Sequence, residues 1–433
     1  MRIGVRQPQV RALLTRLLKA GLNAVDPAQA VRRSVRRVGT IIQIGRHQYD
    51  LRDYARVVAV GAGKASARMG TALEALLGTR LATGLVVVKY GHSVPTRMIE
   101  VVEAGHPIPD RAGQKGGTRL LRLVRGLDPN DLLFVLLSGG ASGLLPAPAP
   151  GLTLADKQKT TQFLIRSGAT IQEINTVRKH LSAIHGGRLA AASRAPVVAL
   201  IISDVTGDLP THIASGPCTP DPTTYADARE ILARYKVEPP ASVKARLEKA
   251  ADETPKPGDP AFAKARNKVI ATAHGSLEAA ARVFAAKGVQ PVILGDNVTG
   301  EAAEVAKVMA ALVHEIRRYG APWKPPVALI SGGECTVTIT GEGGRGGRCA
   351  EFLLSLGIET GGVWAIACDT DGIDGSEDNA GAILTPDSMT RGRDAKALLA
   401  RHDSYGFFSA LGDLVMTGPT RTNVNDYRAI LIR

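Results

Sequence analysis

The feature that most constrains the fold of this chain is a series of short, continuous apolar runs, each ending in a glycine-rich or acidic segment. Three of them read "RVVAVGAGKASARMGTALEALL", "DLLFVLLSGGASGLL" and "APVVALIISDVTGDLP". Runs rich in Val, Ile and Leu that alternate with helical patterns predict a parallel sheet covered by helices on both faces. Ligands bind at the carboxyl ends of the strands in such sheets. The unusual segments follow those ends, so we expect the active site there.

The length of 433 residues exceeds what one hydrophobic core usually serves, which predicts two domains. The segment "RRYGAPWKPPVALI" holds three prolines between a helical pattern and a strand-like run, and we place the domain boundary there. The expected domains are residues 1–324, of which the first 50 are mainly helical and basic, and residues 325–433. The second domain contains the strand-like runs "VALISGGECTVTITG", "GVWAIACDTDGIDGS" and "AGAILTP".

The distribution of charge argues against a nucleic-acid partner. The formal net charge is +14, but residues 1–56 hold 12 of the 54 Lys and Arg and only 3 of the 40 Asp and Glu. This basic segment is explained by a solvated helical face or by a patch for an anionic partner. Aromatic residues make up 4% of the chain, too few for the base-stacking platforms of a single-strand binder.

The composition also bears on the cellular compartment. No apolar run is long enough to span a bilayer, and the basic start reads as an amphipathic helix rather than a signal peptide. The four cysteines lie far apart with no C-x-x-C pair, which argues against a disulfide framework and a zinc site. We therefore expect a cytoplasmic protein without a membrane partner, either a monomer or a homodimer.

Two glycine loops are candidates for anion binding, and the first is "GAGKAS". It places Gly63 and Lys64 between a strand and a helix, where amides at the helix N-terminus and a lysine suit an anion. Ser66 stands where the dinucleotide fingerprint has its third glycine, and a Walker A loop needs a longer spacing before its lysine. A plain strand-to-helix turn is the alternative.

The second loop, "SGGASG", combines a bare backbone with hydroxyl groups. At a strand end, such a loop can wrap phosphate oxygens through its N–H groups, and a flexible turn is the alternative. The candidate residues of this loop are Ser138, Gly139, Gly140 and Ser142.

The stretch "EINTVRKHLSAIHGGRLA" mixes polar and apolar residues at helical spacing. Arg178 in this stretch is a candidate for binding substrate or phosphate, and a solvated helix face is the alternative. No other residues at metal-ligand spacing accompany His180 and His185. We therefore expect these two histidines at helix caps or on the surface.

Two acidic segments also follow strand-like runs. "SDVTGDLP" contains Asp204, and "ACDTDGIDGSEDNAGA" contains four aspartates within ten residues, from Asp369 to Asp378. The glycine and closing glutamate of an EF-hand are missing, whereas Mg²⁺ takes a few carboxylates together with waters and phosphate oxygens. A helix-capping turn explains one aspartate but not four. Asp371, Asp374 and Asp204 are therefore candidate magnesium ligands, with binding of a substrate hydroxyl as the other interpretation.

Five of the seven residues 341–347 are glycine, and two arginines lie among or directly after them. The amides of Gly343 and Gly344 together with the guanidinium of Arg348 suit a phosphate or carboxylate. Because a glycine run costs conformational entropy on folding, it indicates an anion to be held. Asn425 lies in "TGPTRTNVNDYRA", a polar loop that suits a ligand, although a simple turn explains it nearly as well.

Taken together, seven motifs resemble the glycerate 2-kinases with a MOFRL C-terminal domain, some of which carry the older label hydroxypyruvate reductase. They occur in order from about residue 57 to the C-terminus: "GAGKAS", "LLSGGASGLL", "INTVRKHLSAIHGGRLA", "SDVTGDLPTHIASGPCTPDPTT", "SGGECTVTITGEGGRGGR", "DTDGIDGSEDNAGA" and "TGPTRTNVNDYRA". The resemblance implies an α/β protein with two α/β/α domains. The N-terminal one is Rossmann-like with a parallel sheet, the C-terminal MOFRL domain is smaller, and the active site lies in the cleft between them.

The resemblance also implies a reaction, the conversion of ATP and D-glycerate to ADP and 2-phosphoglycerate with Mg²⁺. Lys64 matches the family's lysine in the first glycine turn and Arg348 its arginine at the end of the glycine run. Asp371 lies in the matching T-D-G-I-D-G loop and Asn425 in the matching T-N-V-N-D loop. The chain departs from the family pattern at three places: Cys349 and Ala350 replace a common Asn-Gln, Asp369 replaces a small residue, and Thr206 replaces a proline.

Anion cradles, cations and acidic loops are together typical of phosphoryl transfer. We expect Lys64 and Arg348 to meet the charge of the transferring group or the glycerate carboxylate, and Asp371, with Asp374 second, to hold Mg²⁺ or orient the attacking hydroxyl. One alternative is an NAD(P)H-dependent hydroxypyruvate reductase, which the broken dinucleotide fingerprint disfavours. The other is a non-enzymatic binder of anions or nucleic acid, which the acidic loops at strand ends disfavour.

Overall fold

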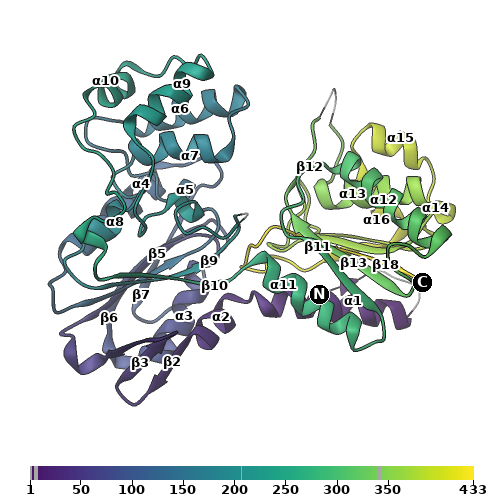
Figure 1. The fold of residues 1–433 in the computed structure, drawn as a ribbon, viewed down its shortest axis with the longest axis horizontal. Coiled ribbons are helices and arrows are strands. Elements are labelled where there is room, and N and C mark those ends of the chain that lie inside the picture. The colour runs from purple at the N-terminus through teal and green to yellow at the C-terminus, as the bar shows by residue number, and fades with distance from the viewer. Residues whose placement is uncertain (1, 4–7, 206, 340, 342) are drawn as a thin grey trace. The chain divides into compact units, whose positions relative to one another are not determined.

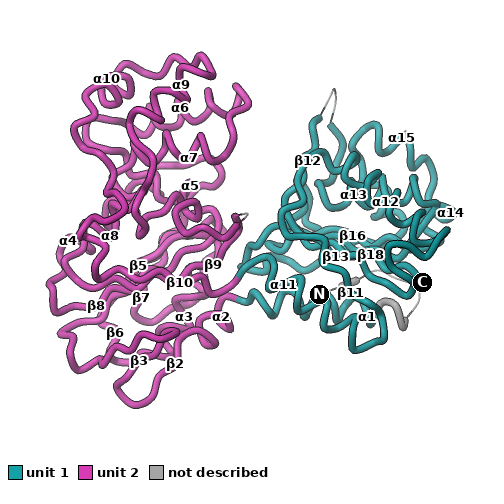
Figure 2. The backbone as a smooth tube through the Cα atoms, in the orientation of Figure 1, with its two compact units in different colours: residues 1–26, 272–433 teal, residues 27–271 magenta. Residues whose placement is uncertain are grey.

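The chain divides into two compact units in a computed structural model that describes residues 2–3, 8–205, 207–339, 341 and 343–433. Unit 1 comprises residues 1–26 and 272–433, and unit 2 comprises residues 27–271 (Figures 1 and 2). None of the helices among the described residues is long and apolar enough to cross a membrane.

Unit 2 is built on a parallel sheet of six strands in the order β10-β9-β8-β5-β6-β7. The chain runs outward from β5 to β7, returns to β8 beside β5, and then runs outward again on the other side. This is the doubly wound order of a Rossmann sheet, whose switch point lies between β5 and β8. The strands are β5 (Val57–Ala62), β6 (Leu81–Lys89), β7 (Ile99–Ala104), β8 (Leu132–Leu137), β9 (Val197–Ile202) and β10 (Ala265–Ala271).

The apolar runs of the sequence form the central strands of this sheet, as predicted. Every residue of β5, β8 and β9 is buried, because helices cover both faces. Side chains alternate between the faces, so that Val135 packs with Leu120 of α4 (Arg111–Arg125), whereas Leu136 faces α3 (Ser66–Leu77). Three short helices also lie around this sheet: α2 (Pro27–Ser34), α5 (Ala141–Leu144) and α8 (Arg188–Ala191).

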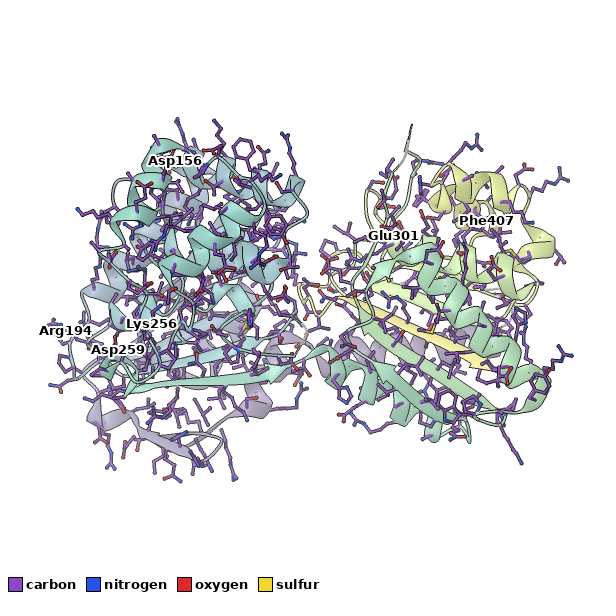
Figure 3. All side chains as sticks on the ribbon, turned by 45° about the horizontal axis from the view of Figure 1, so that its top comes forward. Asp156, Arg194, Lys256, Asp259, Glu301 and Phe407 are labelled. Atoms are coloured by element: carbon purple, nitrogen blue, oxygen red, sulfur yellow. The ribbon has the colours of Figure 1, made fainter. Side chains whose placement is uncertain are left out.

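Four further helices of unit 2 form a group beyond the sheet with a hydrophobic core of their own (Figure 1). Three of them begin with a threonine capping box, in which the threonine and an acidic residue three positions later satisfy each other's backbone N–H groups. Asp156, labelled in Figure 3, is the acidic partner in the first of these boxes. The helices are α6 (Leu154–Arg166), α7 (Ile171–His180), α9 (Tyr225–Arg234) and α10 (Ala241–Lys249).

The first 50 residues are only partly helical, which corrects the sequence prediction. α1 (Pro8–Ala24) and α2 are followed by three antiparallel strands, β2 (Val35–Val38), β3 (Ile41–Ile44) and β4 (His47–Asp50). In β3, the buried Ile42 and Ile44 are separated by the half-exposed Gln43, so successive side chains alternate between two faces. This two-residue period favours strands over a helix.

Unit 1 is a three-layer α/β/α arrangement around a sheet of seven strands in the order β1-β17-β16-β15-β18-β13-β11. Among the described strands of this sheet, β11 and β13 pair in parallel and the other pairs are antiparallel. α1 and α11 (Ala273–Ala285) cover one face, and α12 (Ala302–Tyr319) and α13 (Arg348–Thr360) cover the other. The strands are β1 (Arg2–Ile3), β11 (Gln290–Gly295), β13 (Val327–Gly333), β15 (Trp364–Asp369), β16 (Gly381–Leu384), β17 (Leu414–Met416) and β18 (Asp426–Ile432).

Smaller elements complete unit 1. A short parallel pair, β12 (Gly300–Glu301) with β14 (Cys335–Thr336), links the start of α12 to the segment after β13, and Glu301 is labelled in Figure 3. Three short helices follow β16, and Phe407 of the last is buried in the core (Figure 3). These helices are α14 (Ser388–Arg391), α15 (Ala395–Ala400) and α16 (Ser404–Leu411).

The division into units differs from the predicted boundary between residues 324 and 325. The elements α11, β11 and α12 precede that boundary but belong to unit 1, because β11 pairs with β13 and α11 packs on α1. The proline-rich segment thus connects α12 to β13 within one unit, and the unit boundaries fall after residues 26 and 271. Residues 290–295, expected in the first domain, form an edge strand of the other sheet.

Candidate functional site

The two predicted glycine loops of unit 2 meet at the switch point of its sheet. The N–H of Lys64 donates to the carbonyl of Gly139 at 2.9 Å, and the N–H of Ala65 donates to Oγ of Ser138 at 3.0 Å. Gly63 has φ of +128°, and a Cβ there would lie 2.2 Å from the Ser138 Oγ, so this position requires glycine. The sequence predicted that N–H groups of this turn would face an anion. The N–H groups of Lys64 and Ala65 instead donate to the second loop and join the two loops.

Ser66, which stands at the third position of the broken dinucleotide fingerprint, is fully buried. Its Oγ donates to the carbonyl of Leu136 in β8 at 2.9 Å. The hydroxyl thus fastens the start of α3 to the neighbouring strand. A glycine at this position would lack that bond, so the departure from the fingerprint has a structural consequence in this chain.

Three of the predicted segments come together beside these loops. The Oγ atoms of Ser142 and Ser215 lie 2.7 Å apart, and Ser215 donates to Oδ1 of Asn175 at 3.2 Å. Ser142 belongs to the second glycine loop, Asn175 to α7, and Ser215 to the segment that follows the acidic loop after β9. Asp204 lies in that acidic loop, two residues beyond the end of β9.

A cavity of about 400 Å³ opens next to Ser142 and Gly143 of the second loop. Lys157 of α6, Arg178 of α7 and His185, which follows α7, contribute polar side chains to its wall. Arg178 was predicted to bind an anion, and the structure places it here with Ser142 rather than on a solvated helix face. Its Nε donates to Oγ1 of Thr161 at 3.4 Å.

Sequence reasoning missed Lys157, although a signal was present. Lys157 shares one face of α6 with Leu154 and Leu164, so a charged residue interrupts an apolar stripe. The side chain is only 7% exposed. Burial, helped by the nearby charge of Arg178, lowers the pKa of Lys157 to about 7.

The two histidines expected at caps or on the surface are buried, which corrects that prediction. His180 has its Nδ1 2.7 Å from the carbonyl of Thr176 and its Nε2 2.9 Å from Oε1 of Glu253. His185 is 1% exposed and neither ring nitrogen has a hydrogen-bond partner among the described residues. Burial and then the charges of the nearby lysines and arginine hold the pKa of His185 well below its usual value.

Unit 1 carries a second cationic centre at the start of α13. Nε of Arg348 donates to Oδ1 of Asp426 and Nη2 donates to Oδ2 of Asp369, both at 2.7 Å. Nη1 lies 3.5 Å from Oε1 of Glu334. Asp369 and Asp426 are paired residues on the neighbouring strands β15 and β18. Burial lowers the pKa of Arg348, but the carboxylates of Asp426 and Asp369 raise it overall above its usual value.

Two of the predicted magnesium ligands are engaged by backbone groups of the same unit. Both carboxylate oxygens of Asp374 accept N–H groups from the first turn of α13, Oδ1 from Cys349 at 3.0 Å and Oδ2 from Ala350 at 2.8 Å. Oδ1 of Asp371 accepts the N–H of Ile373 at 3.0 Å. Burial raises the pKa of Asp374 to about 7.

The three candidate ligands are divided between the two units. Asp371 and Asp374 belong to unit 1, whereas Asp204 belongs to unit 2. Over the described part of the chain, no cluster of three or more His, Cys, Asp or Glu side chains is arranged to hold a metal ion. Asp374 therefore acts in this structure as the cap of a helix rather than as an open ligand.

The glycine run of unit 1 has a packing reason that the sequence interpretation did not foresee. A Cβ on Gly344 would lie 2.5 Å from the carbonyl oxygen of Arg401, so the backbone segments approach too closely for a side chain. Gly343 lies against the side chain of Ile339. The neighbouring Arg345 is exposed and lies over the ring of Tyr405. Close packing of residues 343–347 thus explains these glycines without an anion.

Asn425 is joined to the acidic segment of unit 1. Its carbonyl accepts the N–H of Thr370 at 3.1 Å and Oγ1 of Thr370 at 2.7 Å, and its φ of 64° is in the left-handed region. The N–H of Thr420 donates to the carbonyl of Asp371 at 3.0 Å. Two predicted motifs, residues 369–378 and 417–425, therefore lie together around the strand end that also carries Asp369.

Comparisons with known proteins agree with this arrangement. Residues 13–248 match a family described as "Domain of unknown function (DUF4147)", and residues 327–426 match the MOFRL family. The chain is 38% identical to a glycerate 2-kinase of Pyrococcus horikoshii, with 96% of each chain covered. It is 48% identical to a protein of Agrobacterium vitis named putative hydroxypyruvate reductase, with 98% of this chain and 94% of the relative covered.

A crystal structure of glycerate kinase from Thermotoga maritima superposes with a TM-score of 0.86 at 37% identity, covering 99% of this chain and 100% of that one. The matched class is thus an α/β protein with an N-terminal DUF4147 segment and a C-terminal MOFRL segment. The chain belongs to the glycerate 2-kinase family with a MOFRL domain, which confirms the resemblance drawn from the seven motifs.

Proposed function

We propose that this protein is a kinase that transfers the γ-phosphoryl group of ATP to the 2-hydroxyl of D-glycerate, with Mg²⁺. The observation that carries the proposal is the junction of two glycine loops at the switch point of unit 2, beside a cavity lined by cations. Ligands bind at this point of a doubly wound sheet. The names of the glycerate kinase relatives support glycerate as the substrate and its phosphorylation as the reaction.

Phosphoryl transfer needs positioning and positive charge more than covalent chemistry. Arg348 supplies a guanidinium whose orientation is fixed by Asp369 and Asp426, so little reorganisation is needed when an anion arrives. Its remaining N–H groups can donate to phosphate or carboxylate oxygens. Lys64, on the loop that is hydrogen-bonded to Gly139, supplies the second charge.

Mg²⁺ is bound by nucleotide-dependent kinases through one or two carboxylates, waters and phosphate oxygens. Asp371 fits this limited requirement, because its segment is fixed by two hydrogen bonds: its N–H donates to Oδ1 of Asp369, and its Oδ1 accepts the N–H of Ile373. Asp374 does not fit, because both of its oxygens accept helix amides. When bound, the ion would supply positive charge that neutralises the phosphates, and we assign Asp371 as the residue that would hold it in this chain.

A hydroxypyruvate reductase is the second candidate, since the relatives from Agrobacterium vitis carry that name. The switch point of the sheet is also where dinucleotides bind in related topologies. Against this candidate, the loop after β5 has Ser66 in place of the third fingerprint glycine, and its hydroxyl is bonded to the adjacent strand. The loop after β5 therefore favours the kinase over the reductase.

One assay distinguishes the two candidates. Purified protein is incubated with D-glycerate, ATP and Mg²⁺ while ADP is followed, and the phosphoglycerate isomer is identified by NMR. A parallel reaction contains hydroxypyruvate with NADH or NADPH. We expect glycerate-dependent ADP formation with 2-phosphoglycerate as the product. Oxidation of the nicotinamide without ADP formation would reject the kinase, and the 3-phospho isomer would reject the assignment of the reacting hydroxyl.

A further inference from the structure

The cavity of unit 2 has the composition of a site for a small organic anion. Pro107, Ile108 and Pro146 form an apolar part of its wall, and cationic and hydrogen-bonding side chains of α6 and α7 form another. Its volume of about 400 Å³ lies within the range of ordinary ligand pockets. Ser142 and Gly143 connect it to the glycine loop at the switch point.

The two cations of this cavity lack a counter-ion of their own. Among the described residues, no Asp or Glu forms an ion pair with Lys157 or Arg178. Lys179, the next residue after Arg178, differs in this respect, because it is paired with the buried Asp221 at 3.2 Å. Lys157 is buried and Arg178 is half-buried, and charges removed from water are normally paired because leaving them unpaired is costly. The missing partner indicates that a ligand supplies the negative charge.

His185 is the second, independent observation. Both of its ring nitrogens are buried at the cavity without a hydrogen-bond partner among the described residues. Since burial disfavours the imidazolium form, the ring is neutral and has one N–H to donate and one nitrogen to accept. Such a ring can donate to a carboxylate oxygen or accept from a hydroxyl, and a 2-hydroxy acid offers both groups.

We propose that this cavity is the acceptor-substrate pocket, in which Lys157 and Arg178 bind the carboxylate of glycerate and His185 hydrogen-bonds to the same molecule. The proposal rests on the proposed function and assigns the acid to unit 2. The planar guanidinium of Arg178 matches a carboxylate with two parallel hydrogen bonds. Ser142 then places the glycine loop, the expected cradle of the phosphates, next to the bound acid.

Because Lys157 has no carboxylate partner among the described residues, the proposal can be tested by the uptake of a proton on binding as well as by activity. Within the described part of the chain, Arg178 is the charge that acts on Lys157, and the neutral ring of His185 shares the cavity, so neither group favours the protonated form of the amine. At pH 8 we therefore expect this amine to be largely neutral in the free protein. A carboxylate in the cavity favours the ammonium form, and binding of glycerate should take up close to one proton, about the maximum for a single titrating group.

The test is titration calorimetry of D-glycerate into the nucleotide-free protein at pH 8, in two buffers of different ionisation enthalpy. We expect proton uptake in the wild type, no uptake in Lys157→Met, and a dissociation constant raised about tenfold or more in both Lys157→Met and Arg178→Gln. Lys159→Gln and Arg166→Gln are matched controls, because both side chains are exposed on α6 and outside the cavity wall. Thermal melting checks that every variant is folded.

Glycerate affinity and proton uptake that stay at wild-type values in both variants would overturn the pocket, and normal ADP formation in the same samples would show that the kinase function still stands. If the wild type binds glycerate with these signatures but forms no ADP with ATP and Mg²⁺, the proposed function fails and the pocket stands. A wild type that binds no glycerate while it phosphorylates glycerate at low substrate concentration would also overturn the assignment of the acid to this cavity.

Discussion

The two units hold buried and half-buried cations in opposite ways. Arg348 of unit 1 is bound by Asp369 and Asp426 and approached by Glu334, whereas Lys157 and Arg178 of unit 2 have no carboxylate partner among the described residues. The pKa of Arg348 is raised despite its burial, and burial lowers the pKa of Lys157 and of Arg178. The difference separates a cation oriented in advance by the protein from cations that depend on a ligand for their charge balance.

The largest expected effect comes from removing the oriented cation. Arg348→Ala should lower kcat about 1000-fold or more, because a preorganised donor to the transferring group is lost. It should also lower the free energy of unfolding by about 3 kcal/mol, since two buried carboxylates lose their partner. Arg345→Ala, at the exposed neighbouring arginine, is the control for both measurements. Near wild-type turnover of Arg348→Ala would contradict the catalytic assignment.

Lys64→Ala should lower kcat by a similar factor, about 1000-fold, while leaving the protein folded. The hydrogen bonds that join its loop to Gly139 and Ser138 are made by main-chain N–H groups, which this substitution keeps. Steady-state kinetics and thermal melting separate the two effects, with Lys115→Ala on the exposed side of α4 as the control. A variant that unfolds, or one that turns over normally, would count against this assignment.

The difference between the two units can be removed by placing a carboxylate beside the cations of unit 2. Thr161 lies 3.4 Å from Nε of Arg178 and lines the cavity, so Thr161→Asp should place a negative charge beside the unpaired cations. We expect glycerate affinity to fall about 100-fold, because the side chain competes for the same charges, while the melting temperature rises. Thr161→Asn is the neutral control. Unchanged affinity in the aspartate variant would mean that glycerate binds elsewhere.

The smallest predicted effect concerns stability and pH. The pKa of Lys157 is about 7 in the folded chain and about 10.5 when the side chain is solvated. Between pH 7 and pH 10.5 the unfolded state binds more protons than the folded state, so the free energy of unfolding rises with pH. Below pH 7 the amine is charged in both states, and the full cost of burying the charged Lys157 destabilises the fold. The free energy of unfolding of the wild type, relative to Lys157→Met, should rise by about 1.4 kcal/mol per pH unit from pH 7.5 to 9.5.

Urea unfolding of the two proteins at several pH values measures this slope. Lys159→Met, on the exposed part of the same helix, should follow the wild type over the whole range. Parallel curves for the wild type and Lys157→Met would show that Lys157 stays protonated in the folded protein, and that another group balances its charge.

Much of the fold could be predicted from local pattern. Continuous apolar runs predicted the buried parallel strands of unit 2, and the loops after β5 and β8 were correctly placed at strand ends. What local pattern does not encode is which sheet a strand joins. Residues 290–295 form a strand, as their pattern predicts, but pair with β13, so the domain boundary placed at residue 324 does not match the compact units.

The candidate site was predicted less completely, because burial and pairing depend on distant parts of the chain. Arg178 was singled out and lies in the cavity, whereas Lys157, on another helix, was not. Asp374 has the residue type of a metal ligand, yet both of its oxygens cap α13. Gly344 was predicted to bind an anion through its N–H group, yet the close approach of the Arg401 backbone already explains why this residue is glycine.

The most direct test of the central claim is the pair of Michaelis constants of Arg178→Gln, measured for D-glycerate and for ATP, beside those of Arg166→Gln. If the unpaired cations of unit 2 hold the acid, the KM for glycerate rises about tenfold or more and the KM for ATP stays at the wild-type value. A raised KM for ATP with an unchanged KM for glycerate would contradict the account, since the cavity would then serve the nucleotide.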